Sequence, residues 1–221
     1  LFYVKFERST LSSIQLALTS NTSLRNIETF RGLDTLSAAV FFQALKTNRS
    51  VKKIKMFEPA FGNSSYQVFK NLLKENETLE EIELINPVSL GTKAEPTPKL
   101  QENLANLLEG IAESPSLKTV KVSLSKTAML EEDTTAIFSH SRIAAAFKDM
   151  LTKNNVLTTL KLVNFRFKGP ELEAIGAGLQ NNKTLENLIL EGNLMSWKGM
   201  KGFTAGLPGN TSLRNIDLQK N

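Results

Sequence analysis

The residues best suited to acid–base or nucleophilic chemistry lie in one short segment around the single histidine of the chain. His140 is flanked by Ser139 and Ser141, and an acid, Glu132, precedes them. A hydrolase site would need a serine, a histidine base and an orienting acid within hydrogen-bonding reach. Nothing in this spacing imposes that geometry, so we expect His140 to be a polar loop residue beside a helix that starts near Arg142.

The acidic run Glu131-Glu132-Asp133 is the first candidate for a metal site. It lacks the alternating Asp or Asn ligands and the glycine of a calcium loop. The chain also has no cysteine and one histidine, which excludes disulfides, thiolate zinc sites and histidine clusters. We therefore expect no metal, no cofactor and no enzymatic activity.

The composition is that of a folded protein without a strong attraction to nucleic acid or to membranes. Of the 221 residues, 41% are hydrophobic and 22% are charged, which is enough to bury a core. The net charge of +5 is spread along the chain, and its densest cluster, Lys52-Lys53-Ile54-Lys55, is short. No apolar run approaches the roughly 18 residues of a membrane span. These features argue against nucleic-acid binding and against membrane insertion.

Any function must then come from the arrangement of the elements, and these repeat along the chain. Six turns of the form Asn-x-x-Leu/Val and one Ser-x-x-Leu turn each lead into an apolar anchor, which usually opens the pattern L-x-x-I-x-L. The anchors, including one at the chain start, are residues 1, 24, 51, 79, 117, 157, 185 and 213. A period near 28 residues with two longer units is typical of leucine-rich repeats.

The second half of each unit has the period of a helix. Apolar residues recur there at i, i+3 and i+7, which predicts one buried stripe on a helix of about three turns. The seven stripes end at Leu18, Leu45, Leu73, Ile111, Leu151, Leu179 and Leu207. An asparagine or serine follows each stripe, and we expect it to end the helix because asparagine tolerates the left-handed conformation.

Strand, loop and helix units of this kind predict an α/β fold. Parallel strands joined by helices need right-handed crossovers, so the repeats should form a right-handed horseshoe solenoid with a concave parallel sheet and convex helices. Stacking of neighbouring units buries stripes that one unit cannot bury alone. We expect a single domain over residues 1–221. Because it starts and stops within the repeat, we also expect a piece of a longer chain whose uncapped ends self-associate.

The repeat carries a resemblance to a known family. The run Leu185-Glu-Asn-Leu-Ile-Leu-Glu-Gly-Asn193 matches LxxLxLxxN, and the pattern resembles the ribonuclease-inhibitor-like subclass of leucine-rich-repeat proteins. Within it, residues 43–56 and 72–84 look most like tropomodulin, and CARMIL proteins share this style of repeat. The resemblance implies a non-catalytic protein-interaction scaffold of the actin cytoskeleton, with actin or an actin-associated protein as partner. The alternative is a regulator of a small GTPase, although the key loop residues of such proteins have no match here.

Asn-x-Ser/Thr sequons are frequent, but most of them coincide with the repeat turn. They occur at Asn21, Asn48, Asn63, Asn76, Asn182 and Asn210. Because the turn itself demands asparagine at five of these positions, we expect the side chains to be engaged there rather than glycosylated. Together with the absence of cysteine, this favours a cytoplasmic protein.

The positions that stacking does not need are the candidates for function. Side chains alternate across a strand, so the third, fifth and seventh positions of each unit should face the concave side. The candidate contact residues from the seventh position are Phe30, Phe57, Ile85 and Val163. The first three should form a contiguous apolar ladder, and such surfaces usually mark interaction sites. Trp197, in the strand-to-helix loop of a later unit, is a further candidate anchor.

Two consecutive units are longer than the rest. Their insertions, at 86–98 and 125–140, should emerge side by side at one edge of the sheet. Insertions in a repeat array are often on the binding face, so Met129, Leu130 and Phe138 of the second insertion are candidate contacts as well. The alternative is drift in two exposed loops.

Overall fold

The computed structural model describes residues 8–30, 33–60, 62–87, 97–125 and 141–221. Helices and strands alternate along these ranges. The helices are α1 (Arg8–Ser20), α2 (Thr35–Thr47), α3 (Asn63–Glu75), α5 (Thr97–Ala112), α6 (Ser141–Lys153), α7 (Gly169–Asn181), α8 (Trp197–Ala205) and the 3-10 helix η3 (Leu207–Gly209). The strands are β1 (Asn26–Phe30), β2 (Lys53–Phe57), β3 (Glu81–Ile85), β4 (Thr119–Ser123), β5 (Thr159–Val163), β6 (Asn187–Ile189) and β7 (Asn215–Asp217).

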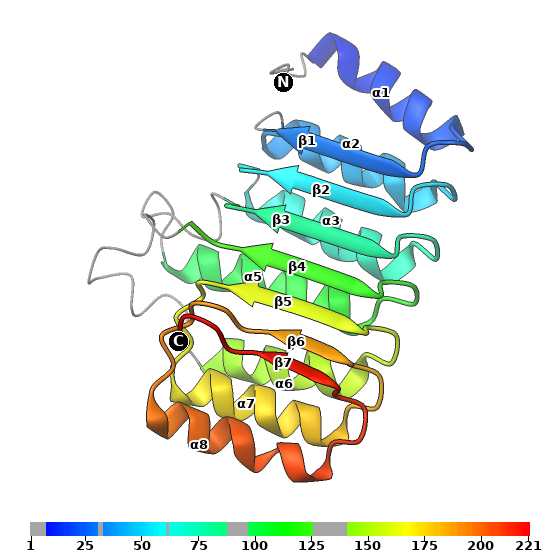
Figure 1. The fold of residues 1–221 in the computed structure, drawn as a ribbon. Helices are drawn as coiled ribbons and strands as arrows, with labels where there is room; N and C mark the ends of the chain where they lie inside the picture. The colour runs from blue at the N-terminus through cyan, green and yellow to red at the C-terminus, as the bar shows by residue number, and fades with distance from the viewer. Residues whose placement is uncertain (1–7, 31–32, 61, 88–96, 126–140) are drawn as a thin grey trace.

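The seven strands of the described chain form one parallel sheet in the order β1 to β7. Figure 1 shows the helices side by side on one face of this sheet, with α1 at the end next to β1. The predicted α/β leucine-rich-repeat solenoid is therefore confirmed. The strand expected at residues 1–6 lies outside the described residues, as do most of the two insertions.

The core runs through the whole stack between the sheet and the helices. In β2, Ile54 and Met56 are completely buried, whereas the alternate positions are half-buried on the opposite face. The helices contribute the stripes that the sequence predicts, and neighbouring helices interlock: the ring of Phe42 on α2 stacks on Phe69 of α3 with centroids 4.4 Å apart. Each unit thus completes the core of the next.

The repeat asparagine joins consecutive units. Asn48 is 1% exposed, and its Oδ1 accepts hydrogen bonds from the backbone N–H groups of Ser50 and Val51, both at 2.8 Å. Its Nδ2 donates to the carbonyl oxygens of Leu18 at 2.6 Å and Asn21 at 3.0 Å in the preceding unit. Its φ of −67° is not left-handed, so the conformation predicted for this residue is wrong. Asparagine is needed here because its side-chain oxygen accepts hydrogen bonds within its own turn, while its side-chain nitrogen donates hydrogen bonds to the preceding unit.

The same bonding recurs in other units and accounts for the sequons. Asn76 and Asn182 are each 3% exposed and use both ends of the amide in the same way. The expectation that these side chains are engaged in the turn is confirmed. Where Ser114 replaces the asparagine, the hydroxyl oxygen of Ser116 lies 2.9 Å from the carbonyl oxygens of both Asn76 and Leu79, and its single hydrogen is shared between them.

Candidate functional site

An apolar ladder crosses the first three described strands at their C-terminal ends. Phe30, Phe57 and Ile85 are direct register partners, as the repeat predicts. The rings of Phe30 and Phe57 lie 6.0 Å apart between centroids, tilted by 47°. Phe30 is 37% exposed, and the other two side chains are half-buried. We call these three residues the concave ladder.

Backbone bonds beyond the strands hold the concave ladder in place. The residues that follow Phe57 and Ile85, which are Glu58 and Asn86, have positive φ angles of 46° and 50°. Glu58 N–H donates to the carbonyl of Ile85 at 2.7 Å, and Asn86 N–H donates to that of Ser123 at the same distance. Each bond extends the pairing between neighbouring strands by one residue beyond the ladder position.

Charged side chains border the ladder on the concave face. The ammonium nitrogen of Lys55 lies 4.8 Å from the centroid of the Phe57 ring, within reach of a cation–π interaction, and 3.4 Å from the carboxylate of Glu83. Two residues earlier on β3, Glu81 binds Lys53 at 3.1 Å and Lys121 at 2.8 Å. The charges beside the ladder therefore neutralise one another and leave the apolar groups as its distinguishing feature.

The ion pairs also shift the acidity of the glutamates involved. Burial raises the pKa of Glu81, but hydrogen bonds from Lys121 and Lys53 outweigh it and hold that pKa below its ordinary value of 4.5. Hydrogen bonds from Lys52 and Lys118 lower the pKa of the neighbouring Glu80 in the same way. At neutral pH these carboxylates are fully ionised, and the pairing across strands is intact.

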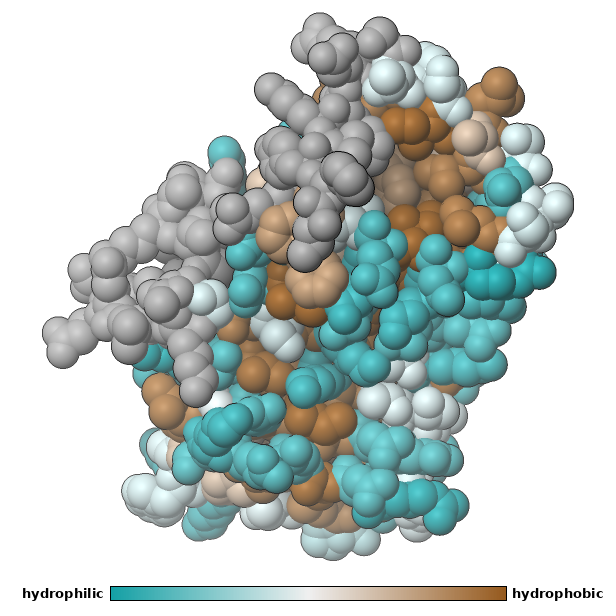
Figure 2. All heavy atoms as spheres, turned by 45° about the horizontal axis from the view of Figure 1, so that its top comes forward, coloured by the Kyte–Doolittle hydropathy of each residue, from teal (hydrophilic) through white to brown (hydrophobic). Residues whose placement is uncertain are grey.

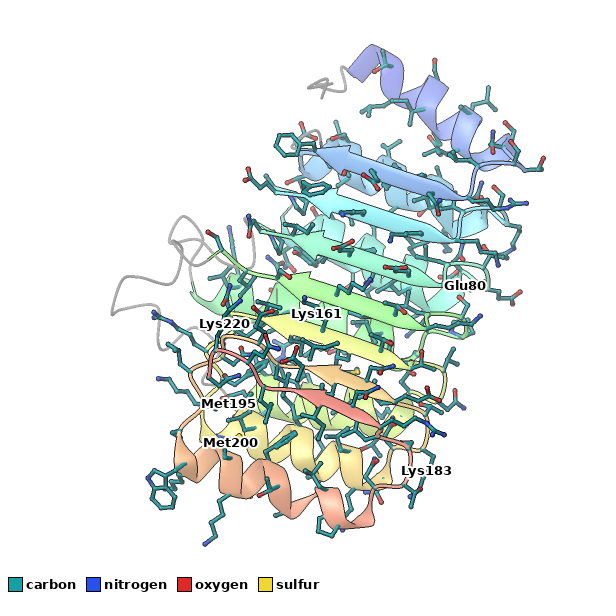
Figure 3. The ribbon with its side chains drawn as sticks, viewed as in Figure 1. Glu80, Lys161, Lys183, Met195, Met200 and Lys220 are labelled. Carbon is teal, nitrogen blue, oxygen red and sulfur yellow. The ribbon has the colours of Figure 1, made fainter. Side chains whose placement is uncertain are left out.

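Val163 keeps the predicted register but not the predicted exposure. It pairs with Ser123, yet its side chain is only 9% exposed. The backbone of Glu191 lies alongside, since Asn164 N–H donates to its carbonyl at 3.0 Å. The Glu191 carboxylate binds Lys161 and Lys220, both of which are labelled in Figure 3. Val163 therefore drops out of the candidate contact residues.

The remaining predicted contacts do not join the concave ladder. Trp197 is 79% exposed, but it starts α8, which follows β6 and so lies three strands beyond the last ladder strand β3. Met129, Leu130 and Phe138 lie outside the described residues. The same is true of His140 and of the acidic run at 131–133.

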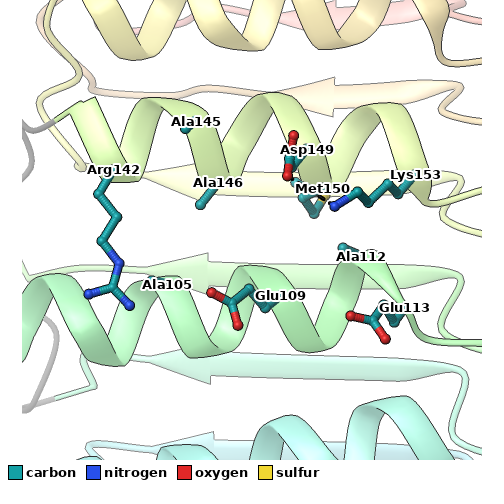
Figure 4. A pocket seen from close by; sticks show the side chains of 10 residues that line it. All are labelled: Ala105, Glu109, Ala112, Glu113, Arg142, Ala145, Ala146, Asp149, Met150 and Lys153. Atoms are coloured by element: carbon teal, nitrogen blue, oxygen red, sulfur yellow. Dashed lines mark hydrogen bonds and ion pairs between the residues drawn. The ribbon is translucent and has the colours of Figure 1, made fainter.

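One hollow was not found from the sequence. A groove of about 220 Å³ lies between α5 and α6, over small side chains that include Ala105, Ala112 and Ala146 (Figure 4). The alanine run at 144–146 is the sequence signal that could have indicated it. The acids on its rim are already bound by lysines, in the pairs Lys70–Glu109, Lys74–Glu113 and Lys153–Asp149. We assign the groove no function because nothing in its lining selects a ligand.

The described residues offer neither a metal-binding cluster nor a membrane-spanning helix. They contain no group of three or more histidine, cysteine, aspartate or glutamate side chains that could hold a metal ion. None of the described helices has both the length and the apolar character needed to cross a membrane.

Comparison with known proteins supports the resemblance that the repeats predict. No family model matches the chain. Protein CARMIL of Dictyostelium discoideum is 26% identical over 217 residues, which covers 96% of this chain and 19% of CARMIL. The chain therefore spans about a fifth of the length of that relative.

Two solved structures are similar to this chain at low identity. One is the tropomodulin C-terminal domain of Caenorhabditis elegans, at 10% identity and a TM-score of 0.43, covering 90% of this chain and 92% of that one. The other is leiomodin-1 actin-binding site 2, at 16% identity and the same TM-score of 0.43, covering 92% of this chain and 91% of that one.

Proposed function

We propose that this chain is a non-catalytic scaffold that binds a protein of the actin cytoskeleton through the concave ladder. The observation that carries the proposal is the ladder itself: Phe30, Phe57 and Ile85 align across three strands without being needed for stacking. The side chains that stacking does need, such as Met56 and Leu84, point the other way and are completely buried.

The size of the ladder fits a partner contact. Removing three large apolar side chains from water contributes several kcal/mol at roughly 25 cal/mol per Å², before the cost of association. Aromatic residues at the centre of a contact are the side chains whose loss most often weakens binding. The lysines and glutamates around Phe57 are paired with one another, so they would help to select the partner in contact rather than attract it from a distance.

The choice of actin rests on similarity. The repeats resemble those of CARMIL and tropomodulin, and the alignment with CARMIL covers almost the whole chain. The sequence resemblance implies actin-cytoskeleton work for proteins of this kind. The alternative, a regulator of a small GTPase, receives no support from these relatives.

A direct binding experiment distinguishes the two functions. The purified chain is incubated with actin filaments and sedimented, and its affinity for monomeric actin is measured by fluorescence. The same chain is then tested against a panel of small GTPases. Binding to actin with no effect on GTPase binding or turnover supports the proposal, and the reverse result supports the alternative.

A further inference from the structure

Two large apolar side chains are exposed at the start of α8, one in the loop before the helix and one on its first residue. Trp197 is 79% exposed and Leu194 is 62% exposed. Leu194 also has a φ of 52°, in the left-handed region that a leucine enters at a cost. Neither packing nor backbone conformation favours leucine at this position, so its presence calls for another explanation.

Residues near these two side chains in the sequence pack against the hydrophobic core. Met195 and Met200 are half-buried and pack against the core near the start of α8 (Figure 3). The side chain of Ser196 accepts a hydrogen bond from Gly199 N–H at 3.2 Å and so caps the helix. Trp197 is therefore held on an ordered helix start rather than on a loose segment.

The first turns of α7 and α8 lie against each other. A Cβ atom placed on Gly199 would lie 3.5 Å from the Cα of Gly169, the first residue of α7. Both helices thus direct their N-terminal ends, with their partial positive charge, to the same part of the surface. Ser196 and Lys168 are the two residues that precede these helices.

Three lysines without ion pairs to the described residues lie near the starts of α7 and α8. Lys168, Lys198 and Lys201 are exposed, and none has an ion pair to another described residue. Their situation differs from that of the lysines on the concave face, such as Lys53 and Lys121, which share the carboxylate of Glu81.

Few acids are available to neutralise these lysines. The glutamate in the first turn of α7, Glu171, is completely buried and accepts from the backbone N–H of Lys168 at 3.1 Å. Glu173 is the exposed acid on the facing side of α7, next to Gly202 of α8. The first turns of the two helices therefore carry an excess of positive charge.

We propose that Leu194, Trp197, Lys168, Lys198 and Lys201 form a second protein-binding surface, which takes an acidic partner segment that also carries large apolar side chains. Charge complementarity selects the occupant, because the lysines and both helix N-termini favour carboxylates. Trp197 and Leu194 supply the apolar anchor. An anionic membrane fits less well, because the exposed Glu173 would face it and the apolar area is limited to two side chains. This surface follows β6, three strands beyond the last ladder strand β3, and goes beyond the function proposed for that ladder.

The chain contains one tryptophan, so this surface has its own optical reporter. A displayed library of random 16-residue peptides is selected for binding to the immobilised chain. Peptides that also bind the triple variant Trp197→Ala/Lys198→Glu/Lys201→Glu are discarded, because they bind elsewhere on the protein. The three side chains are exposed, and circular dichroism checks that the variant is folded. The selected peptides are expected to be rich in Asp and Glu with at least one aromatic residue or leucine. A synthetic copy should shift the Trp197 emission to shorter wavelength.

Charge variants and lipid vesicles complete the test. The Lys198→Glu/Lys201→Glu variant, which keeps Trp197, should bind the selected peptide about tenfold more weakly, and raised salt should weaken binding to the parent chain. The proposal is overturned if no peptide survives the removal step, if the survivors are neutral or basic, or if they bind the charge variant equally well. It is also overturned if phosphatidylserine-containing vesicles, and not acidic peptides, shift the emission.

Discussion

The side-chain amide of Asn76 donates a hydrogen bond of 2.9 Å to the backbone carbonyl of Asn48, the asparagine at the same place in the preceding unit. It also donates to the carbonyl of Leu45 at 2.8 Å, and its oxygen accepts from Thr78 N–H and Leu79 N–H at 2.8 and 2.7 Å. One buried side chain therefore joins the end of one helix, the turn of its own unit and the start of the next strand.

Replacing this asparagine should cost more stability than an ordinary surface change. Asn76→Ala leaves buried carbonyl and N–H groups without partners, each at about 1–3 kcal/mol. We expect the free energy of unfolding to fall by about 3 kcal/mol in urea titrations followed by circular dichroism.

Asn21 offers a matched control for that measurement. It occupies the same place in the first described turn, but it is exposed, and its side-chain oxygen accepts hydrogen bonds from the backbone N–H groups of Ser23 and Leu24 in its own turn. Asn21→Ala should cost about 1 kcal/mol or less. Equal losses for Asn21→Ala and Asn76→Ala would contradict the role assigned to the bonds between units.

The repeat pattern predicted these positions but not how they work. The pattern L-x-x-I-x-L sets the strand register directly, because side-chain alternation leaves one choice of inward face, and Phe30, Phe57 and Ile85 align as expected. The conformation of Asn48 was predicted wrongly, because the same residue type serves both left-handed helix ends and turns bonded through the side chain. The bonding partners are carbonyl groups of another unit, which spacing alone does not reveal.

Other features depend on distances between units and so escape the sequence. Val163 is covered although its column position predicts exposure, because burial depends on neighbouring side chains such as those around Glu191. The groove between α5 and α6 depends on how far apart two helices lie. The ion-pair status of Lys198 and Lys201 depends on which acids face them, and Glu171 turns inward.

The packing of α7 against α8 makes a second stability prediction. A Cβ atom on Gly206 would lie 1.9 Å from the carbonyl oxygen of Gly176, closer than any real contact. Gly206→Ala should force the two helices apart and lower the unfolding free energy by about 2 kcal/mol.

Gly169→Ala provides the comparison for this change, because a Cβ atom there meets nothing within 4 Å. It should be neutral or slightly stabilising in the same thermal and urea melts, since alanine restricts the unfolded chain. If Gly206→Ala is as harmless as Gly169→Ala, the close approach of the two helices is not as described.

The glutamate pairs predict how stability depends on pH. The pKa of Glu81 is lowered in the folded protein relative to its ordinary value of 4.5, so the folded state binds fewer protons than the unfolded chain below neutrality. The stabilisation from this pair is present above pH 4.5 and is lost as the pH falls through the lowered pKa. Urea titrations should therefore show stability declining below about pH 5.

The contribution of this residue can be separated from the general effect of acid. Glu81→Gln removes the titrating group that Lys53 and Lys121 share. The variant should be less stable than the parent at pH 7 and should lose less stability between neutral and acidic pH. An unchanged pH profile in Glu81→Gln would show that the pair does not act as described.

The concave ladder is the proposed binding surface for actin. Its most direct test is to measure the affinity of the Phe57→Asp variant for actin filaments by co-sedimentation. Phe57 is outside the core cluster, so the variant should remain folded by circular dichroism. Leu16→Asp on α1, where the parent side chain is 70% exposed, introduces the same charge away from the ladder. We predict that Phe57→Asp binds actin filaments at least about tenfold more weakly while Leu16→Asp binds like the parent. A folded Phe57→Asp variant with unchanged affinity, or a parent chain that does not bind actin, would contradict the account.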